Sequence, residues 1–249
     1  MICGGKETFS RSAVLLGEGA MRKLADAHVL VVGVGGVGSW CAEALVRTGV
    51  GHITLVDDDV IAESNVNRQC PATAKTIGRP KVEAMAERLK EINPECEVEA
   101  ICARYPYSPF PTPSSLVIDA IDSVDCKAEL ILSATEAGVP IVSSMGAALR
   151  LDPTKVKVTR FEKVEGDGLA RALRQRFKKL GRFPAAKFSC VWSGEQPRGR
   201  GPRSLFCTSG RETASPLLPE KGSLMQVTAV FGMCLASEAI KILTKGETK

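Results

Sequence analysis

The chain has 249 residues and a formal net charge of +5, with 44% hydrophobic and 24% charged residues. This length and composition can bury one substantial core, so we expect a single α/β domain over residues 1–249. No stretch is expected to be long and apolar enough to span a membrane, and the N-terminus lacks a signal pattern, which predicts a cytoplasmic protein. Nine cysteines are scattered without a CxxC pair, so we expect neither a disulfide framework nor a paired zinc site.

Residues 8–28 begin with polar side chains and continue as a short amphipathic helix that leads into the first strand. Arg11 lies in the polar part, and a solvated surface arginine is one interpretation of it. His28, directly before the strand, is expected to have a structural role.

A strand, a glycine-rich turn and a helix follow. Residues 29–32 are an apolar run rich in β-branched side chains, which predicts a buried parallel strand, and residues 39–48 continue with helical spacing. Between them lie Gly33, Gly35, Gly36 and Gly38. Gly33 would permit a tight turn and Gly38 a close packing of helix on strand, while the middle pair would let a phosphate approach the backbone. The helix N-terminus would then favour the anion.

The next strand, residues 53–57, ends in Asp57, at the offset of about 20 residues from which a carboxylate can bond ribose hydroxyls. The segment after it carries two cations that could return over the nucleotide, Arg68 and Lys81. A triphosphate needs this positive charge more than a dinucleotide does, so the pattern favours ATP. The other predicted contacts are Asp59, in the acidic run that starts at Asp57, and Asn65, whose amide adds no charge.

A strand at residues 117–122 also ends in a carboxylate. Asp122 is suited to hold Mg²⁺ against phosphate oxygens, with an N-cap of the following helix as the structural alternative, and Ser123 beside it completes the predicted nucleotide site. Together these elements predict a Rossmann-like, doubly wound and mostly parallel sheet in a nucleotide-binding half, about residues 8–145.

The second half, about residues 146–245, changes character. Residues 147–161 read as two antiparallel strands joined by a turn at 152–154, which would extend the sheet. A helix at 169–182 carries cations on its outer faces: Arg171, Arg174, Lys178 and Lys179. Clustered cations on one helix favour a polyanionic partner, while a solubilising surface helix is the alternative.

Residues 193–222 contain few large apolar side chains and many Gly, Pro and Ser residues, which predicts a mobile loop. Cys207 is the only cysteine in this loop, and its position does not support a catalytic role. A final helix at 224–243, with apolar side chains at helical spacing, is expected to pack against the core.

These motifs together resemble the ubiquitin-activating-enzyme-like adenylyltransferases, which include the MoeB and ThiF activators of sulfur carriers. The resemblance rests on the glycine turn and on the residues after Asp57, namely Ser64, Asn65, Asn67, Arg68, Gln69, Gly78, Pro80 and Lys81. Segments beyond the nucleotide site, among them 92–94, 152–154 and 227–232, are similar to the branch of tRNA threonylcarbamoyladenosine dehydratases. The similarity extends over roughly residues 8 to 245.

The resemblance implies that a carboxylate is adenylated with ATP and Mg²⁺. It places Gly35 and Gly36 at the phosphates, Asp57 at the ribose, Asn65, Arg68 and Lys81 at the triphosphate, and Asp122 at the magnesium ion. It also implies a homodimer in which Arg11 crosses to the triphosphate of the other subunit. For the basic helix it implies tRNA as the polyanion.

Two other interpretations remain open. The first is adenylation of a ubiquitin-like sulfur carrier, with a cysteine desulfurase or sulfur-acceptor system as partner. Many such activators hold zinc with two CxxC pairs, which this sequence lacks. The second is a nucleotide-binding module without catalysis, which the presence of Arg68, Lys81 and Asp122 disfavours. Several tRNA dehydratases carry a cysteine shortly before the last helix, whereas the aligned residues 217–219 contain none.

Overall fold

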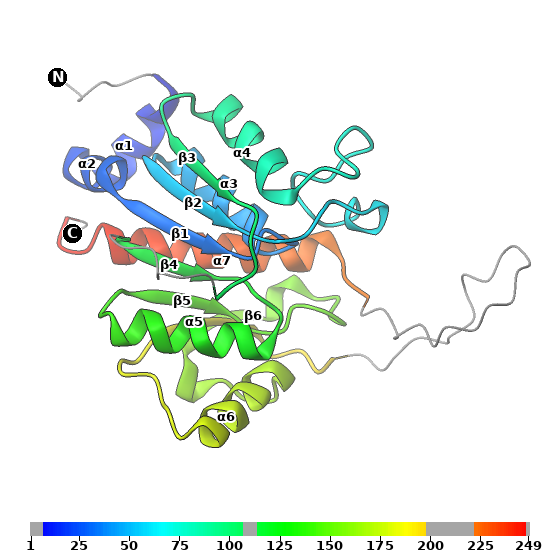
Figure 1. Ribbon diagram of the computed structural model, residues 1–249. Helices are drawn as coiled ribbons and strands as arrows, with labels where there is room; N and C mark the ends of the chain where they lie inside the picture. The colour runs from blue at the N-terminus through cyan, green and yellow to red at the C-terminus, as the bar shows by residue number, and fades with distance from the viewer. Residues whose placement is uncertain (1–6, 107–113, 198–221, 248–249) are drawn as a thin grey trace, which may run out of the picture.

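A seven-stranded β-sheet forms the centre of the molecule in this computed structural model, which describes residues 7–106, 114–197 and 222–247. The strand order is β3-β2-β1-β4-β5-β7-β6 (Figure 1). Among the described strands, β6 alone runs antiparallel to its neighbour. The strands are β1 (His28–Val32), β2 (His52–Val56), β3 (Glu97–Ile101), β4 (Leu116–Asp119), β5 (Ile141–Ser144), β6 (Val156–Arg160) and β7 (Ser189–Ser193). The predicted doubly wound, mostly parallel sheet is confirmed.

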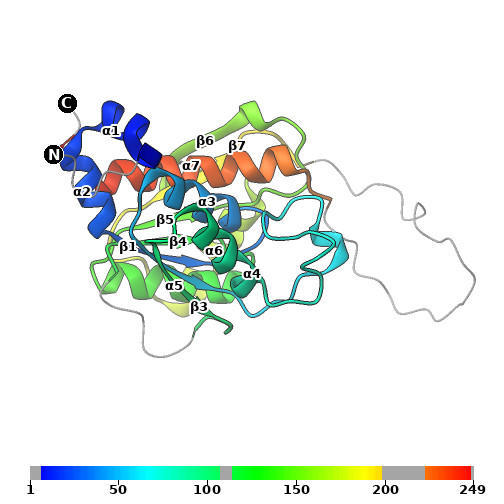
Figure 2. The same cartoon turned by 90° about the horizontal axis from the view of Figure 1, so that it is seen from above.

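Helices cover both faces of this sheet (Figures 1 and 2). They are α1 (Ser10–Leu16), α2 (Glu18–Asp26), α3 (Gly38–Thr48), α4 (Lys81–Ile92), α5 (Val124–Glu136), α6 (Gly168–Leu180) and α7 (Met225–Leu243). Successive residues of a strand point to opposite faces. Val31 of β1 therefore shares one core with Phe231 of α7, while Leu30 shares the other with Phe177 of α6.

The predicted antiparallel pair within residues 147–161 is wrong in its first half. β6 is present, but residues 147–151 form no strand, and Leu149 there has a φ of 62°. The antiparallel partner of β6 is β7, which pairs Ser193 with Val156 and also lies beside β5. An extended pattern identifies a strand but not its partner, and this partner lies beyond the whole of α6 in the chain.

The apolar helix α7 corrects a second expectation. By length and composition it could cross a membrane, so the prediction that no segment reaches that limit is wrong. In the fold, however, α7 lies along the sheet beside α3 (Figure 2), and its Val227, Phe231 and Leu235 are fully buried. Packing against α3 and the sheet accounts for the apolar residues on this side of α7.

Most of the predicted loop at 193–222 lies outside the described residues. Residues 194–197 follow β7 without regular structure, and Ser223 leads into α7. Residues 198–221, including Cys207, are not described.

Candidate active site

A cleft of about 850 Å³ lies at the carboxyl ends of the parallel strands. The chain order reverses between β1 and β4, and at such a point the connecting loops diverge and leave a crevice. The loops after β1 to β5 line the cleft, together with the N-terminus of α6. The predicted nucleotide-site residues that line it are Gly33, Gly35, Gly36, Asp57, Asp59, Asn65, Arg68, Lys81, Asp122 and Ser123.

The glycine turn has the geometry that the spacing predicts. Gly33 has a φ of 93°, and a Cβ atom there would lie 2.7 Å from the carbonyl oxygen of Ala120. At Gly38, which does not line the cleft, a Cβ atom would lie 1.8 Å from the carbonyl oxygen of Gly33, so this glycine permits the close contact of α3 with β1. A Cβ atom at Gly35 would meet no atom within 4 Å. The backbone at Gly35 is therefore open to a ligand.

Asp57 is fixed by two backbone amides at the end of β2. Its Oδ2 accepts from the N–H of Val34 at 2.6 Å, and its Oδ1 accepts from the N–H of Asp59 at 2.9 Å. Burial raises the pKa of the Asp57 carboxyl, an effect that nearby Lys81 and the two amides oppose. The amide from Val34 joins Asp57 directly to the glycine turn, so the two parts of the predicted site form one unit.

Lys81 is a buried cation that lines the cleft. Its side chain is 7% exposed, and its Nζ lies 2.5 Å from Asp59 Oδ2 and 3.9 Å from Asp57 Oδ1. The side chain of Asp59 is 66% exposed. The exposed carboxylate can move away, so an anionic ligand can take its place beside the ammonium group.

Arg68 and Asn65 belong to a short turn that follows β2. Asn65 Oδ1 accepts from the N–H of Ala62 at 3.0 Å, and Arg68 Nη1 donates to the carbonyl oxygen of Ser64 at 2.8 Å and to Asn67 Oδ1 at 2.9 Å. These bonds are all local to the turn. Both side chains line the cleft and are partly exposed.

A buried network supports the loop that carries Asp122. Lys127 Nζ donates to Asp119 Oδ2 at 2.7 Å, and the Ser143 hydroxyl donates to the same oxygen at 2.6 Å. Asp119 Oδ1 accepts from the N–H of Ile121 at 3.2 Å. The ion pair is fully buried, whereas Asp122 is exposed and lines the cleft. The network therefore holds the base of this loop and leaves the Asp122 carboxylate available.

The chemistry of the lining fits a magnesium-bound triphosphate. The cleft offers an open glycine backbone and the two cations Arg68 and Lys81 for phosphate oxygens. Asp57, Asp58 and Asp59 hold carboxylate oxygens within 4.8 Å of one another. These oxygens and that of Asp122 are hard ligands of the kind that Mg²⁺ takes.

Several residues of the cleft were not predicted. Gln69 is 6% exposed and its Oε1 has no hydrogen-bond partner among the described residues. Its position directly after Arg68 is the feature of the sequence that could have identified it as a cleft residue. Arg104 lines the cleft after β3. Arg150 and Asp167 also line the cleft, and no local pattern marks them.

The remaining predicted residues lie outside the cleft. Arg11 is exposed on α1, and Arg171, Lys178 and Lys179 are exposed on α6. Arg174 is directed inward: its Nη2 donates to the carbonyl oxygens of Phe161 and Val164 at 2.9 and 2.7 Å. The guanidinium of Arg174 also lies 4.9 Å from the centroid of the Phe161 ring.

Comparisons with known proteins agree with this geometry. The model of the ThiF family matches residues 9–249. The chain is 39% identical to the tRNA threonylcarbamoyladenosine dehydratase of Escherichia coli, over 95% of this chain and 93% of that protein. It is similar to the crystal structure of E. coli TcdA in complex with ATP, with a TM-score of 0.79 and 38% identity over 95% of this chain and 93% of that one. It is also 31% identical to the molybdopterin-synthase adenylyltransferase of Salmonella typhimurium, over 94% of this chain and 81% of that protein.

Proposed function

The chain belongs to the ThiF family, and on that premise we propose that it is an ATP-dependent tRNA threonylcarbamoyladenosine dehydratase. Its reaction is the cyclisation of N6-threonylcarbamoyladenosine next to the tRNA anticodon, with net loss of water. The observation that carries this proposal is the cleft, where the glycine turn, Asp57, Arg68, Lys81 and Asp122 all come together. The similarity to the E. coli dehydratase over nearly the full length of both chains supports the choice of reaction.

ATP enters this cleft with its phosphates over Gly35 and Gly36, where the start of α3 provides unpaired N–H groups and a favourable dipole. The ribose hydroxyls reach Asp57, whose carboxylate is already oriented by two amides. Phosphate oxygens replace the Asp59 carboxylate beside the ammonium group of Lys81. Mg²⁺ held at Asp122 would neutralise further phosphate charge.

The chemistry has two steps. An oxygen of the threonyl carboxylate attacks the α-phosphorus of ATP and pyrophosphate leaves, while Arg68 and Lys81 stabilise the charge that gathers on the phosphate oxygens. The ureido group of the same side chain then attacks the acyl carbon, loses a proton and closes the ring as AMP leaves. Because the nucleophile is tethered, effective molarities of about 10⁵ M or more are available. No cysteine nucleophile is required.

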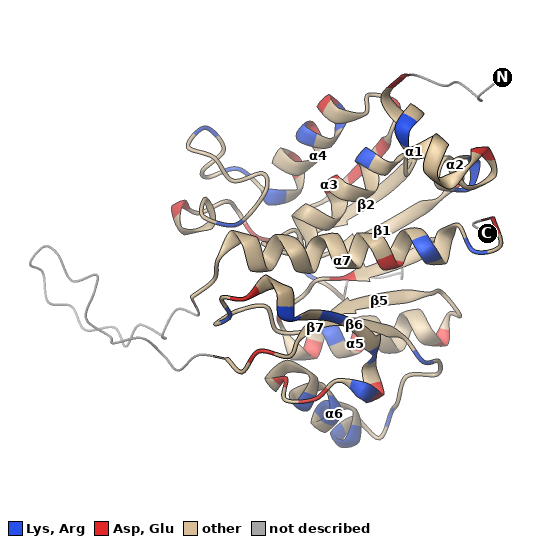
Figure 3. Cartoon of the chain, turned by 180° about the vertical axis from the view of Figure 1, so that it is seen from behind, with Lys and Arg blue, Asp and Glu red and all other residues tan. Residues whose placement is uncertain are grey.

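The tRNA reaches the cleft along α6 in this proposal. The helix begins at the cleft, where Gly168 and Leu169 line it. Its 13 residues span about 20 Å, and Arg171, Lys178 and Lys179 are exposed along it. Figure 3 shows Lys and Arg positions along α6 and on β6. Arg174 is left out of this surface because its guanidinium is bonded inside the subunit.

We also propose that the active unit is a homodimer. Val14 and Leu15 on α1 are 90% and 83% exposed, and Met225 and Met233 on α7 are also exposed. Figure 3 shows the uncovered, largely uncharged face of α7 on the same side of the molecule as α1. A second copy that covers this face would carry Arg11 toward a neighbouring cleft.

Adenylation of a ubiquitin-like sulfur carrier is the second candidate, favoured by the similarity to the Salmonella adenylyltransferase. The two candidates are separated by incubating the protein with ATP and threonylcarbamoylated tRNA, followed by mass analysis of the nucleosides. We expect the cyclic nucleoside, which is lighter than its precursor by one water. Unchanged tRNA, together with ATP-dependent adenylation of a sulfur-carrier protein, would overturn the proposal.

A further inference from the structure

A buried ion pair lines the cleft between the turn after β5 and the start of α6. Arg150 Nη2 lies 3.0 Å from Asp167 Oδ2, and the two side chains are 2% and 1% exposed. Arg150 follows β5, and Asp167 is the residue before α6. Neither residue belongs to the loops that carry the nucleotide site.

Each member of the pair makes further bonds to a different segment of the chain. The guanidinium of Arg150 also donates to the carbonyl oxygens of Gly146, at 2.9 Å, and Glu195. Asp167 accepts from the N–H of Gly146 at 3.2 Å and from the N–H of Ala170 at 2.9 Å, where it caps α6. One ion pair thus joins the turn after β5, the start of α6 and the segment after β7.

Burial of the two charged side chains costs free energy, and the ion pair lies beside the cleft. Two charges taken out of water are often no more stabilising than a well-packed apolar pair of the same volume. Leu149, next to Arg150, has a φ of 62°, which is unfavourable for a residue with a side chain. Leu149, Gly146 and Leu169 all line the cleft. A costly ion pair and a strained residue in one wall indicate that the function of the cleft depends on the shape of this wall.

We propose that Arg150 and Asp167 are positioning residues for the tRNA substrate and not for ATP. This inference rests on the proposed function. The nucleotide loops follow β1, β2 and β4, whereas the ion pair fixes the turn after β5 and the start of α6, the helix that we assign to tRNA. The pair therefore sets the modified adenosine of a docked tRNA against the α-phosphorus of ATP.

The double variant Arg150→Met, Asp167→Asn tests this assignment. It leaves no unpaired buried charge, and asparagine caps a helix as well as aspartate does, so the fold is retained. The bonds from Arg150 to Gly146 and Glu195 are lost. We expect the KM for threonylcarbamoylated tRNA to rise about 10-fold to 100-fold, the scale of a misplaced reactant. The Kd for ATP, measured by calorimetry, should stay unchanged.

Two further variants make the test specific. Arg150→Lys keeps the charge but cannot bridge both carbonyl oxygens, so it should also raise the KM for tRNA. Arg88→Met removes an arginine that joins Glu43 outside the cleft, so it should change neither constant. A wild-type KM for tRNA in the double variant, or parallel losses for ATP and tRNA, would overturn the assignment. If the wild-type protein cyclises no tRNA, it is the proposed function that fails, and the inference fails with it.

Discussion

At the scale of single residues, Lys81 shows how a buried charge remains available to a ligand. Its ammonium group is held by the exposed carboxylate of Asp59 and lies near the buried carboxylate of Asp57. The Asp59 carboxylate is 66% exposed, so it can turn into solvent when a ligand arrives. A phosphate can replace it, while Asp57 stays bonded to its amides.

The first prediction concerns Arg68 and Lys81, the two cations that we assign to the phosphates. Lys81→Ala and Arg68→Ala should each remove about 2–4 kcal/mol of transition-state stabilisation, as the loss of one charge-stabilising donor does. The measurement is the steady-state rate of tRNA cyclisation. Lys75→Ala, an exposed lysine of the same loop region, is the control and should retain full turnover. Near-wild-type rates in either cleft variant would mean that the phosphates are bound elsewhere.

A second prediction concerns thiol reactivity. Burial raises the pKa of the Cys70 thiol to about 12 and that of Cys96 to about 11, and the thiolate is the reactive form. Cys102 is exposed. Brief treatment of the folded protein with iodoacetamide, followed by peptide mapping, should therefore modify Cys102 well before Cys70 or Cys96. Denatured protein should be modified at all three, and early labelling of Cys70 in the native state would contradict its burial.

At the scale of elements, the sequence predicts those parts of the site that are local in the chain. The glycine turn and Asp57 follow from a spacing of residues within one strand–helix–strand unit. α4 likewise has its buried apolar side chains at helical spacing within one segment, and it ends before Asn93. The partner of β6 and the ion pair of Arg150 with Asp167 could not be predicted, because each joins segments that only the folded sheet brings together.

The third prediction tests α6 as a surface for tRNA. Arg171 and Lys178 are seven residues apart in the sequence and so share one face of the helix. Replacing both with Glu should weaken tRNA binding and flatten its dependence on salt by about one to two units, because fewer counterions are released. ATP binding should not change. Binding can be measured by fluorescence anisotropy across a salt series.

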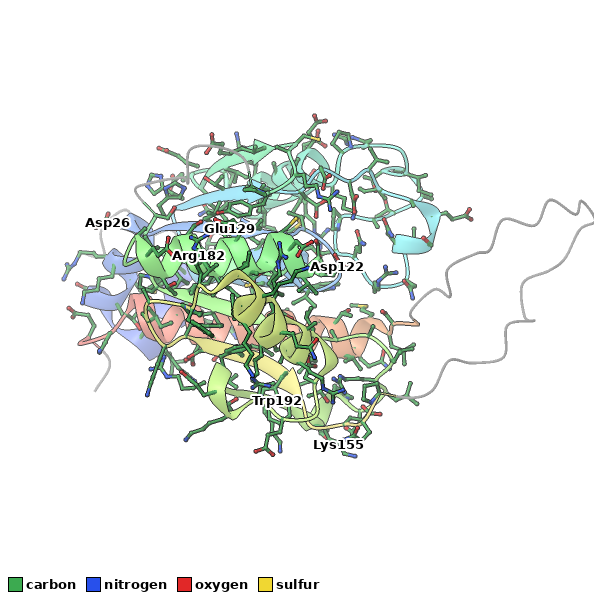
Figure 4. The ribbon with its side chains drawn as sticks, turned by 60° about the horizontal axis from the view of Figure 1, so that its bottom comes forward. Asp26, Asp122, Glu129, Lys155, Arg182 and Trp192 are labelled. Carbon is green, nitrogen blue, oxygen red and sulfur yellow. The ribbon has the colours of Figure 1, made fainter. Side chains whose placement is uncertain are left out.

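The control for α6 reverses two exposed lysines on the other side of the molecule, Lys75 and Lys90, which should have little effect. The far end of α6 lies away from the cleft: Arg182, just beyond it, pairs with Glu129, and Figure 4 shows both at a distance from Asp122. If reversal on α6 leaves the salt dependence unchanged, the helix is a solvated face. The tRNA surface would then have to be sought among the other cations of the chain.

At the scale of the whole molecule, the proposed dimer accounts for a helix that packs poorly in one subunit. α1 has no buried residue, and its Val14 and Leu15 are almost fully exposed. The proposed second chain would remove these apolar side chains from water. In a symmetric dimer the same face of each copy would be covered, with Arg11 of α1 beside it.

The fourth prediction follows from this assembly. If Arg11 completes the site of the other subunit, then Arg11→Ala and Asp122→Ala proteins should each be inactive. Their equal mixture should recover about a quarter of the wild-type activity, since half of the dimers are mixed and each mixed dimer has one intact site. Subunit exchange is verified by differential labelling. No recovery after exchange would place Arg11 outside catalysis, or in the site of its own subunit.

The position of α7 in the chain has a consequence for how the protein is made. Val227, Phe231 and Leu235 complete the core on one face of the sheet, yet they follow every strand in the order of synthesis. Until α7 has left the ribosome, the apolar side chains of α3 and of the sheet that pack against α7 stay uncovered, and such exposed surface is prone to aggregation. Folding of this domain is therefore completed late, and the nascent chain is a natural client for chaperones that bind apolar surface.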